Sequence, residues 1–394
     1  MIVHASRTLG LSVLLAVLTA LPAAAAEPAT IGIVHSEKFA YATMMKNSYD
    51  MAAEAVNRSG GVRGEPVRLV FADDKESRKG GEAAVHELAK EKGAVFLLGG
   101  YSSSNTLYTA MAANRLKIPF LVCTAADDRI TQRKLRHIYR LNPPSAVYAQ
   151  GLEEFLKERV SPASMAIVYE NSPYGTGTAM RMMWFCREND IELLAIVPYL
   201  RERASRNYFE HVLSSLDTKS PDVLYMVSYL KDASQLVPLV REKQYRALLC
   251  GGAGGFTHYR FIERTGEKAE GLVTAALWAP ETGFQGAEAY FQQYLQRFGA
   301  APDYHGAEAY SALIVAAQAL NQAADLRSKS ILEALDRIEM QTPFGPVQFV
   351  DYDRYQRQNR LDTLVLQIIN QQYSCIWPLH LSSGRFTPPP DWRQ

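Results

Sequence analysis

Polar and small residues follow several apolar runs of the sequence, in positions where they could hold a small polar molecule. They occupy residues 36–40, 102–104, 124–127, 171–175 and 251–255. Serine and threonine hydroxyls, together with backbone amides at small residues, can bind an anionic or amide group without burying a full positive charge. The pattern predicts a binding site made of hydrogen-bonding loops.

Motifs of the common enzyme classes are missing from the sequence. There is no Gly-x-x-x-x-Gly-Lys-Ser/Thr phosphate loop, no Gly-x-Ser-x-Gly nucleophile turn and no His-Glu-x-x-His zinc helix. The glycine cluster at 251–255 lacks the Gly-x-Gly-x-x-Gly spacing of a dinucleotide loop. We therefore expect no catalytic residue and no cofactor.

The four cysteines, Cys123, Cys186, Cys250 and Cys375, lie far apart in the sequence. Close pairs, which mark zinc and dithiol redox sites, are absent, so no metal site is predicted. Export would permit disulfides, but the spacing does not define how the cysteines would pair. Cys123 and Cys250 end apolar runs, which favours buried free thiols at these two positions.

Alternating strand and helix patterns must position the polar loops. Short apolar runs alternate with amphipathic stretches from residue 31 to 123, and a second series of the same kind follows from 146 to 250. Each series predicts a doubly wound, parallel α/β sheet with helices on both faces. The tandem prolines Pro143 and Pro144 separate the two series. Because ligands of such sheets bind at the carboxyl ends of strands, the polar loops should line the site.

The first 26 residues are predicted to be a signal peptide. Arg7 precedes an apolar run at 9–21, which ends in the small residues 22–26. No cysteine follows the expected cut, so we expect a mature chain that is free in the periplasm and not inserted in a membrane. Without Arg7 there are 41 basic residues, from a total of 42, against 41 acidic ones. This balance argues against nucleic acid or an anionic membrane surface as a partner.

Seven short motifs along the chain resemble those of a known family, and they occur in that family's order. They are the runs at 57–64 (Asn-Arg-Ser-Gly-Gly-Val-Arg-Gly), 71–74 (Phe-Ala-Asp-Asp), 99–106 (Gly-Gly-Tyr-Ser-Ser-Ser-Asn-Thr), 118–121 (Ile-Pro-Phe-Leu), 174–175 (Tyr-Gly), 270–272 (Glu-Gly-Leu) and 344–347 (Phe-Gly-Pro-Val). Together they resemble the leucine/isoleucine/valine-binding family of type I periplasmic solute-binding proteins. Each motif is weak alone, but the set spans nearly the whole mature chain.

This resemblance implies two lobes joined by a hinge of three strands, which would cross near residues 139–144, 271–277 and 350–355. Lobe one would comprise residues 27–142 and 278–350, and lobe two residues 143–277 and 351–394. The implied function is capture of a small organic solute by a monomer that delivers it to the membrane permease of an ABC transporter. A ligand-sensing module of the same fold, which signals to a receptor partner, is the alternative.

The resemblance also places an anion-binding part of the site in the first lobe. Family members hold a ligand carboxylate with a serine and with backbone amides, and these elements match Ser103, Ser104, Ala125, Ala126 and Asp127 here. Ser103 could instead cap the helix expected from residue 105, and the two roles are compatible.

Further site residues are implied from both lobes. Tyr174 matches a family tyrosine that faces the cleft, although loop packing is its alternative role. Tyr229 follows the strand expected at 223–227 and occupies another cleft position. Tyr41 and His305 align with positions that line the side-chain pocket, while a histidine that begins a helix could also be a surface or capping residue.

Two positions depart from the family pattern. Asp127 stands where the family has threonine, and Ala253 stands where it has the acid that holds a ligand ammonium. Asp127 could replace that acid, or it could pair with Arg129 at the rim. Without an acid partner a buried ammonium is costly, so an unmodified α-amino acid is in doubt as the ligand. The glycines around Ala253 predict extra room, and therefore a larger or more apolar ligand than valine.

Overall fold

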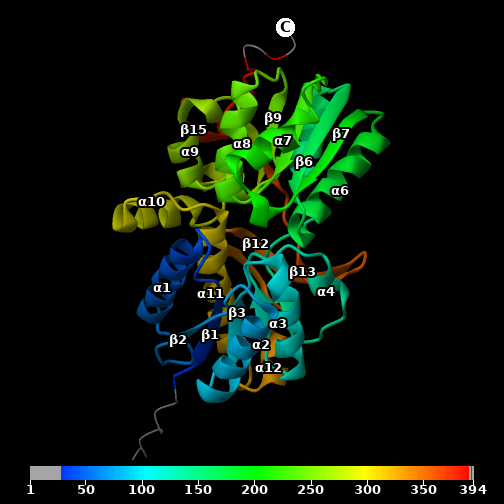
Figure 1. The fold of residues 1–394 in the computed structure, drawn as a ribbon. Coiled ribbons are helices and arrows are strands. Elements are labelled where there is room, and N and C mark those ends of the chain that lie inside the picture. The colour runs from blue at the N-terminus through cyan, green and yellow to red at the C-terminus, as the bar shows by residue number, and fades with distance from the viewer. Residues whose placement is uncertain (1–27, 390–391, 393–394) are drawn as a thin grey trace, which may run out of the picture.

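The computed structural model describes residues 28–389 and residue 392, and it shows two lobes stacked end to end (Figure 1). The predicted signal peptide lies outside the described residues. In the described part of the chain, no helix is long and apolar enough to cross a membrane. All four cysteines are buried free thiols, which confirms the expectation for Cys123 and Cys250 and extends it to Cys186 and Cys375.

The first lobe is built on a sheet of eight strands in the order β11-β12-β13-β5-β4-β3-β1-β2. The run from β5 to β2 is parallel, as predicted, while β11, β12 and β13 pair with one another in antiparallel fashion. The strands are β1 (Thr30–His35), β2 (Arg68–Asp73), β3 (Phe96–Gly99), β4 (Phe120–Val122), β5 (Ile138–Arg140), β11 (Glu339–Thr342), β12 (Gly345–Tyr352) and β13 (Tyr355–Asn359).

Helices cover both faces of this sheet because its central strands are apolar on both faces. Leu98 packs into the core that contains α1 and α11, whereas the adjacent Leu97 packs into the core that contains α2 and α3. Successive strand side chains point to opposite faces, so a continuous apolar run needs cover on both sides. The helices are α1 (Ala42–Arg58), α2 (Arg78–His86), α3 (Ser103–Arg115), α4 (Arg129–Gln132), α11 (Tyr304–Gln322) and α12 (Ser328–Leu335).

The second lobe repeats the design with seven strands in the order β15-β14-β10-β9-β8-β6-β7. Strands β6 to β10 are parallel, and β14 and β15 form an antiparallel hairpin at one edge. The strands are β6 (Ser164–Glu170), β7 (Glu192–Tyr199), β8 (Val223–Val227), β9 (Leu248–Gly251), β10 (Val273–Ala276), β14 (Leu364–Ile369) and β15 (Gln372–Trp377). The helices are α5 (Gln150–Phe155), α6 (Pro173–Glu188), α7 (Arg206–Ser214), α8 (Leu230–Glu242) and α9 (Tyr259–Thr265). The next helix, α10 (Ala287–Phe298), packs on the first lobe, where Arg297 pairs with Glu54 of α1. The predicted fold class, two doubly wound α/β lobes, is confirmed.

One predicted lobe boundary is wrong. The sequence analysis placed residues from 351 onward in the second lobe, but β13 (Tyr355–Asn359) pairs with β5 in the sheet of the first lobe. The reason is the hairpin between β12 and β13, which returns the chain to the first sheet after a turn at Asp353 with φ of 49°. The third crossing between the lobes therefore follows Asn359.

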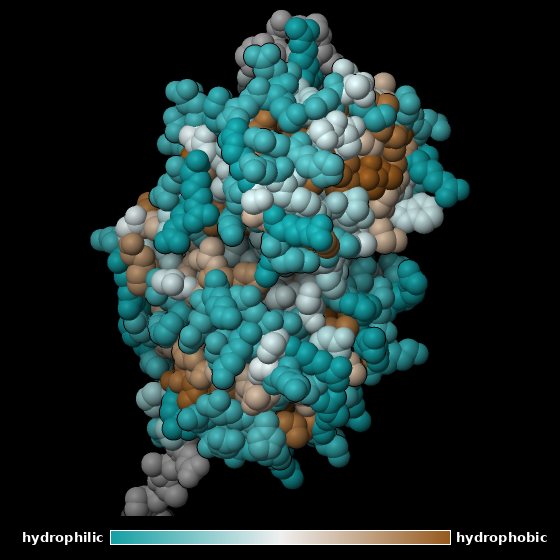
Figure 2. Space-filling model, in the orientation of Figure 1, coloured by the Kyte–Doolittle hydropathy of each residue, from teal (hydrophilic) through white to brown (hydrophobic). Residues whose placement is uncertain are grey.

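The molecular surface is mostly hydrophilic in the view of Figure 2. Its largest hydrophobic area overlies β7 and α6 of the second lobe, where Met180, Trp184 and Ile196 are exposed. The residues of the predicted site lie elsewhere, at the junction between the lobes.

Candidate functional site

Five of the ten predicted site residues meet around one small cavity between the lobes. Its lining residues are Tyr101, Ser103, Thr124, Ala126, Tyr148, Tyr174, Tyr229, Gly254, Tyr304 and His305. Ser103, Ala126, Tyr174, Tyr229 and His305 come from the predicted set, and they belong to both lobes. The cavity holds about 20 Å³, which is about the room for one water, so a ligand needs the lobes to separate or the rings to rotate.

Ser103 connects the two polar loops of the first lobe. Its hydroxyl accepts hydrogen bonds from the backbone N–H groups of Ala126, at 3.1 Å, and Asp127, at 3.2 Å. The structure therefore brings together the serine and the amides that the sequence analysis proposed for anion binding. Ser103 makes these bonds in place of a helix cap. Ser104, one residue further along α3, is exposed and does not line the cavity.

The loop that carries these amides is held from behind by buried contacts. Ala125 is fully buried, and its N–H donates to the carbonyl of Gly100 at 3.0 Å, so Ala125 supports the loop without lining the cavity. Thr124 donates its hydroxyl to the same carbonyl at 2.9 Å.

Arg140 is a positioning residue that sequence reasoning missed. Its side chain is fully buried at the end of β5, and its guanidinium donates to the carbonyl of Asp127 at 2.7 Å, to the hydroxyl of Thr131 at 2.8 Å and to the side-chain oxygen of Gln358 at 2.6 Å. These bonds tie the loop at 124–127 to β5 and β13. A single arginine inside the apolar run of residues 138–141 was the available signal.

The second lobe contributes tyrosines. Tyr174 lies in the first turn of α6 and donates its hydroxyl to the carbonyl of Gly252 at 2.6 Å. The ring of Tyr229, at the start of α8, lies 5.5 Å from that of Tyr174 and 6.2 Å from that of Tyr101 in the first lobe, measured between centroids. These rings face each other across the lobe junction.

Tyr41 and His305 form a second link between the lobes. Their rings lie 3.8 Å apart, and the Tyr41 hydroxyl donates to the carbonyl of Gly254 in the opposite lobe at 2.9 Å. Tyr41 supports the cavity wall without lining the cavity itself. His305 places Nδ1 3.0 Å from the carboxylate of Asp303, which also caps α11 and was not predicted.

Asp127 and Ala253 do not supply an acid to the cavity. The Asp127 carboxylate pairs with Arg129, whose Nη2 lies 2.6 Å from Oδ2 and whose Nε lies 3.0 Å from Oδ1. Of the two predicted roles for Asp127, the structure contains the ion pair. Ala253 is buried beside the lining residue Gly254. Among the described residues that line the cavity, none carries a carboxylate.

The prediction of extra room at the glycine cluster is wrong. A Cβ placed on Gly254 would lie 2.5 Å from the hydroxyl oxygen of Tyr174, and one on Gly252 would lie 2.7 Å from that of Tyr225. The tyrosines occupy the space that the missing side chains leave. These glycines therefore allow close packing of aromatic rings.

The tyrosines of the cavity are neutral hydrogen-bonding groups at physiological pH. Burial raises the pKa of the Tyr101, Tyr148, Tyr174 and Tyr304 hydroxyls well above the usual value, since the phenolate loses its hydration. Such groups bind a ligand through hydrogen bonds and ring faces.

A wider basic opening lies next to the small cavity. This region of about 620 Å³ is lined by Tyr41, Tyr101 and Tyr229, together with five basic and two acidic side chains. The charged residues are Lys38, Arg201, Lys231, Arg260 and Arg264 with Glu76 and Asp232. Arg201 of the second lobe lies over the Tyr229 ring, 5.3 Å from its centroid, and 3.8 Å from the carboxylate of Glu76 in the first lobe. The excess of positive charge favours the approach of anions.

Comparisons with known proteins show the family and the fold of the chain. A family model described as "Periplasmic binding protein" matches residues 30–369. Leu/Ile/Val-binding protein homolog 7 from Brucella melitensis is 24% identical over 347 residues, which cover 84% of this chain and 85% of that protein. Leu/Ile/Val-binding protein homolog 8 from Brucella abortus is 24% identical over 74% of this chain and 75% of that protein.

Solved structures share the fold at low sequence identity. The branched-chain amino acid transporter substrate-binding protein LivJ from Streptococcus pneumoniae, in complex with isoleucine, superposes with a TM-score of 0.79 at 18% identity and covers 88% of this chain and 98% of its own. A leucine-binding protein from Thermotoga maritima gives a TM-score of 0.77 at 16% identity, with coverage of 88% and 97%. Proteins of this kind bind solutes for ABC transporters and are not enzymes. The chain therefore belongs to the periplasmic binding protein family.

Proposed function

We propose that the chain captures a small organic molecule between its two lobes and delivers it to the permease of an ABC importer in the membrane. The observation that carries this proposal is the meeting of Ser103, Ala126, Tyr174, Tyr229 and His305 around one cavity at the lobe junction. A ligand held by residues of both lobes draws them together, as in other hinged binding proteins. Membership of the family supports the transport role.

The ligand favoured by these groups is an amide, an organic or aromatic carboxylate, or an amino-acid derivative. The hydroxyl of Ser103 and the N–H groups of Ala126 and Asp127 can exchange their mutual bonds for bonds to a ligand oxygen. The tyrosines add neutral hydroxyls and ring faces. The basic opening attracts an anionic group toward the cavity.

A free α-ammonium group lacks an acid partner in this arrangement. The described residues that line the cavity include no carboxylate, and Asp127 is already paired with Arg129. Removing an ammonium from water without a partner costs several kcal/mol. Leucine and other unmodified α-amino acids are therefore not the ligands we propose.

Replacing Tyr229 with alanine should weaken binding by about 1 to 2 kcal/mol, or about 5- to 30-fold, because the ligand loses an aromatic wall of the cavity. The measurement is calorimetric titration with the solute that native mass spectrometry identifies in the purified protein. Asp127→Asn is the matched control, since it removes a charge outside the cavity and should change affinity by less than about 1 kcal/mol.

Two results would count against this site. Wild-type affinity in Tyr229→Ala would place the ligand elsewhere. A loss of about 2 kcal/mol or more in Asp127→Asn would mean that Asp127 holds a cationic group of the ligand, contrary to the proposed ligand class.

A further inference from the structure

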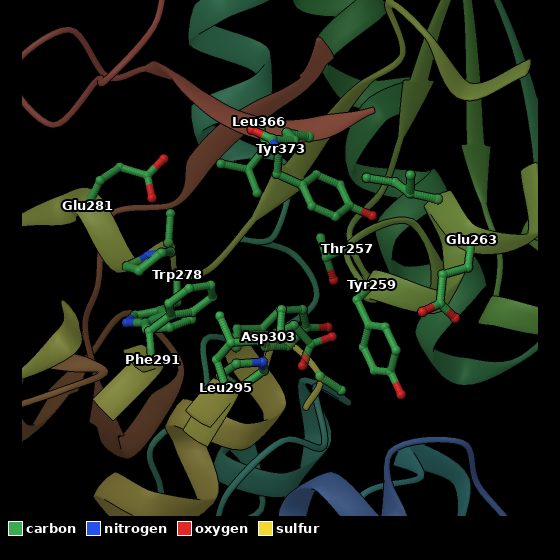
Figure 3. Close-up of a pocket in the computed structure, with 18 of the residues that line it drawn as sticks. Thr257, Tyr259, Glu263, Trp278, Glu281, Phe291, Leu295, Asp303, Leu366 and Tyr373 are labelled. Carbon is green, nitrogen blue, oxygen red and sulfur yellow. The ribbon is translucent and has the colours of Figure 1, made fainter. Parts of the chain in front are cut away.

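A second and larger cavity also lies between the lobes. It holds about 560 Å³, within the usual range for small-molecule sites, and it shares only Tyr304 with the cavity described above. Its walls come from α9, the hairpin of β14 and β15, the segment after β10, α10 and the loop before α11 (Figure 3). Solute capture in the first cavity leaves this space unused.

Aromatic rings form much of its wall. Trp278 and Phe291 lie on one side, Tyr259 lies on the other, and Tyr373 lies above them in Figure 3. The indole N–H of Trp278 donates to the carbonyl of Pro343 at 2.7 Å, and the Tyr373 hydroxyl donates to that of Phe256 at 2.7 Å. These bonds fix the two rings and use their polar atoms. Trp278 is buried, and the rings of Phe291, Tyr259 and Tyr373 are partly exposed.

The ionisable side chains around this cavity are all acidic. They are Glu263, Glu281 and Asp303, and no described lining residue is Lys, Arg or His. The carboxylate of Asp303 is hydrogen-bonded to Nδ1 of His305. Glu281 accepts hydrogen bonds from the Cys375 N–H at 3.3 Å and the Ser383 hydroxyl at 2.9 Å, which are uncharged donors.

Glu263 and Glu281 are the exposed carboxylates of the cavity wall. Neither forms an ion pair with any residue in the described ranges. They lie on opposite sides of the cavity in Figure 3. The basic residues of α9, Arg260 and Arg264, lie one turn apart and line the basic opening. Arg260 also donates from Nε to the hydroxyl of Tyr259 at 3.1 Å.

We propose that this cavity is a second ligand site, for an organic cation with an apolar body such as an amine or quaternary ammonium compound. A cation over aromatic faces gains cation–π attraction, and the two unpaired carboxylates add Coulomb attraction. An anion would meet repulsion from the same carboxylates. The charge preference of this site is therefore opposite to that of the basic opening.

Choline and its uncharged isostere 3,3-dimethylbutan-1-ol test the charge preference, because they differ in the cationic nitrogen and little in shape. Calorimetric titration of the mature wild-type protein should show saturable choline binding and at least about 10-fold weaker binding of the alcohol. The double variant Glu263→Gln/Glu281→Gln should lose about 10-fold or more in choline affinity. Glu288→Gln, a control on α10 outside the cavity, should bind choline like the wild type.

Choline binding should also persist in Tyr229→Ala, because Tyr229 lines only the first cavity and the basic opening. That result separates failure of this site from failure of the proposed solute site. Equal binding of choline and the alcohol, no saturable choline binding at about 20 mM, or unchanged choline affinity in the double variant would each overturn the proposal.

Discussion

Replacing Arg140 with methionine should lower the free energy of unfolding by about 3 kcal/mol. The substitution removes the charged donor from the carbonyl of Asp127 and from the side-chain oxygen of Gln358, which keep only the neutral donors Ile130 N–H and Thr131 hydroxyl. A hydrogen bond to a charged group contributes about 1.5 to 3 kcal/mol. Relief from burying the guanidinium, whose pKa burial lowers, offsets part of this cost. The measurement is urea denaturation followed by circular dichroism.

The same substitution should weaken solute binding by about 10-fold or more, although Arg140 does not line the cavity. Without its bond to the Asp127 carbonyl, the loop at 124–127 loses the support that fixes its amides beside Ser103. Arg133→Met, at an exposed position nearby, should change stability by less than about 0.5 kcal/mol. Stability within about 1 kcal/mol of the wild type in Arg140→Met would show that these bonds do not hold the loop.

Replacing Gly175 with alanine should destabilise the protein by about 3 kcal/mol. A Cβ at this position would lie far inside van der Waals contact with the backbone carbonyl of Glu170, which ends β6 and cannot move without its sheet. Overpacking of this kind costs about 1 to 3 kcal/mol, and more when the obstacle is backbone. The start of α6 must then shift, and Tyr174 shifts with it. Thermal unfolding measures the loss.

The sign of this change is diagnostic, because alanine is about 1 kcal/mol better than glycine inside a helix. If the space were open, Gly175→Ala would raise the melting temperature. Thr176→Ala, at the next position of the same turn, is the control and should differ little from the wild type. A stable Gly175→Ala variant that binds solute normally would contradict the close approach of α6 to β6.

The sequence predicted the parallel sheets and the meeting of polar loops at the candidate site because both follow from local pattern. Apolar runs of strand length at residues 95–98 and 120–123 are followed by polar loops, and parallel strands bring such loops to one edge of a sheet. Ser103 and Ala126 therefore came together as expected. The hydrogen bond between them depends on how the loop after β3 and the loop after β4 are placed relative to each other, and no local sequence pattern determines this placement.

Features that depend on packing between distant segments escaped prediction. The number of glycines predicted a roomy pocket, but Tyr174 and Tyr225 fill the space beside Gly254 and Gly252. The sequence shows only that Arg140 is a charged residue in an apolar strand. Its role depends on hydrogen-bond partners on β13 and in the loop at 124–127, which lie far away in the sequence or in another element. β13 returns to the first sheet because it pairs with β5, and this pairing joins segments that are far apart in the chain. The hydrogen bond from Arg140 to Gln358, for example, links residues separated by 218 positions.

A crystal structure of the protein with its bound solute tests the central claim most directly, namely that both lobes enclose the ligand at the cavity of Ser103 and Tyr229. The solute can be the compound that co-purifies with the protein. The account predicts ligand density between the loop at 124–127 and the tyrosines of the second lobe, with a ligand oxygen in contact with the amides of Ala126 and Asp127. Density for that solute on one lobe only, or away from Ser103 and Tyr229, would contradict it.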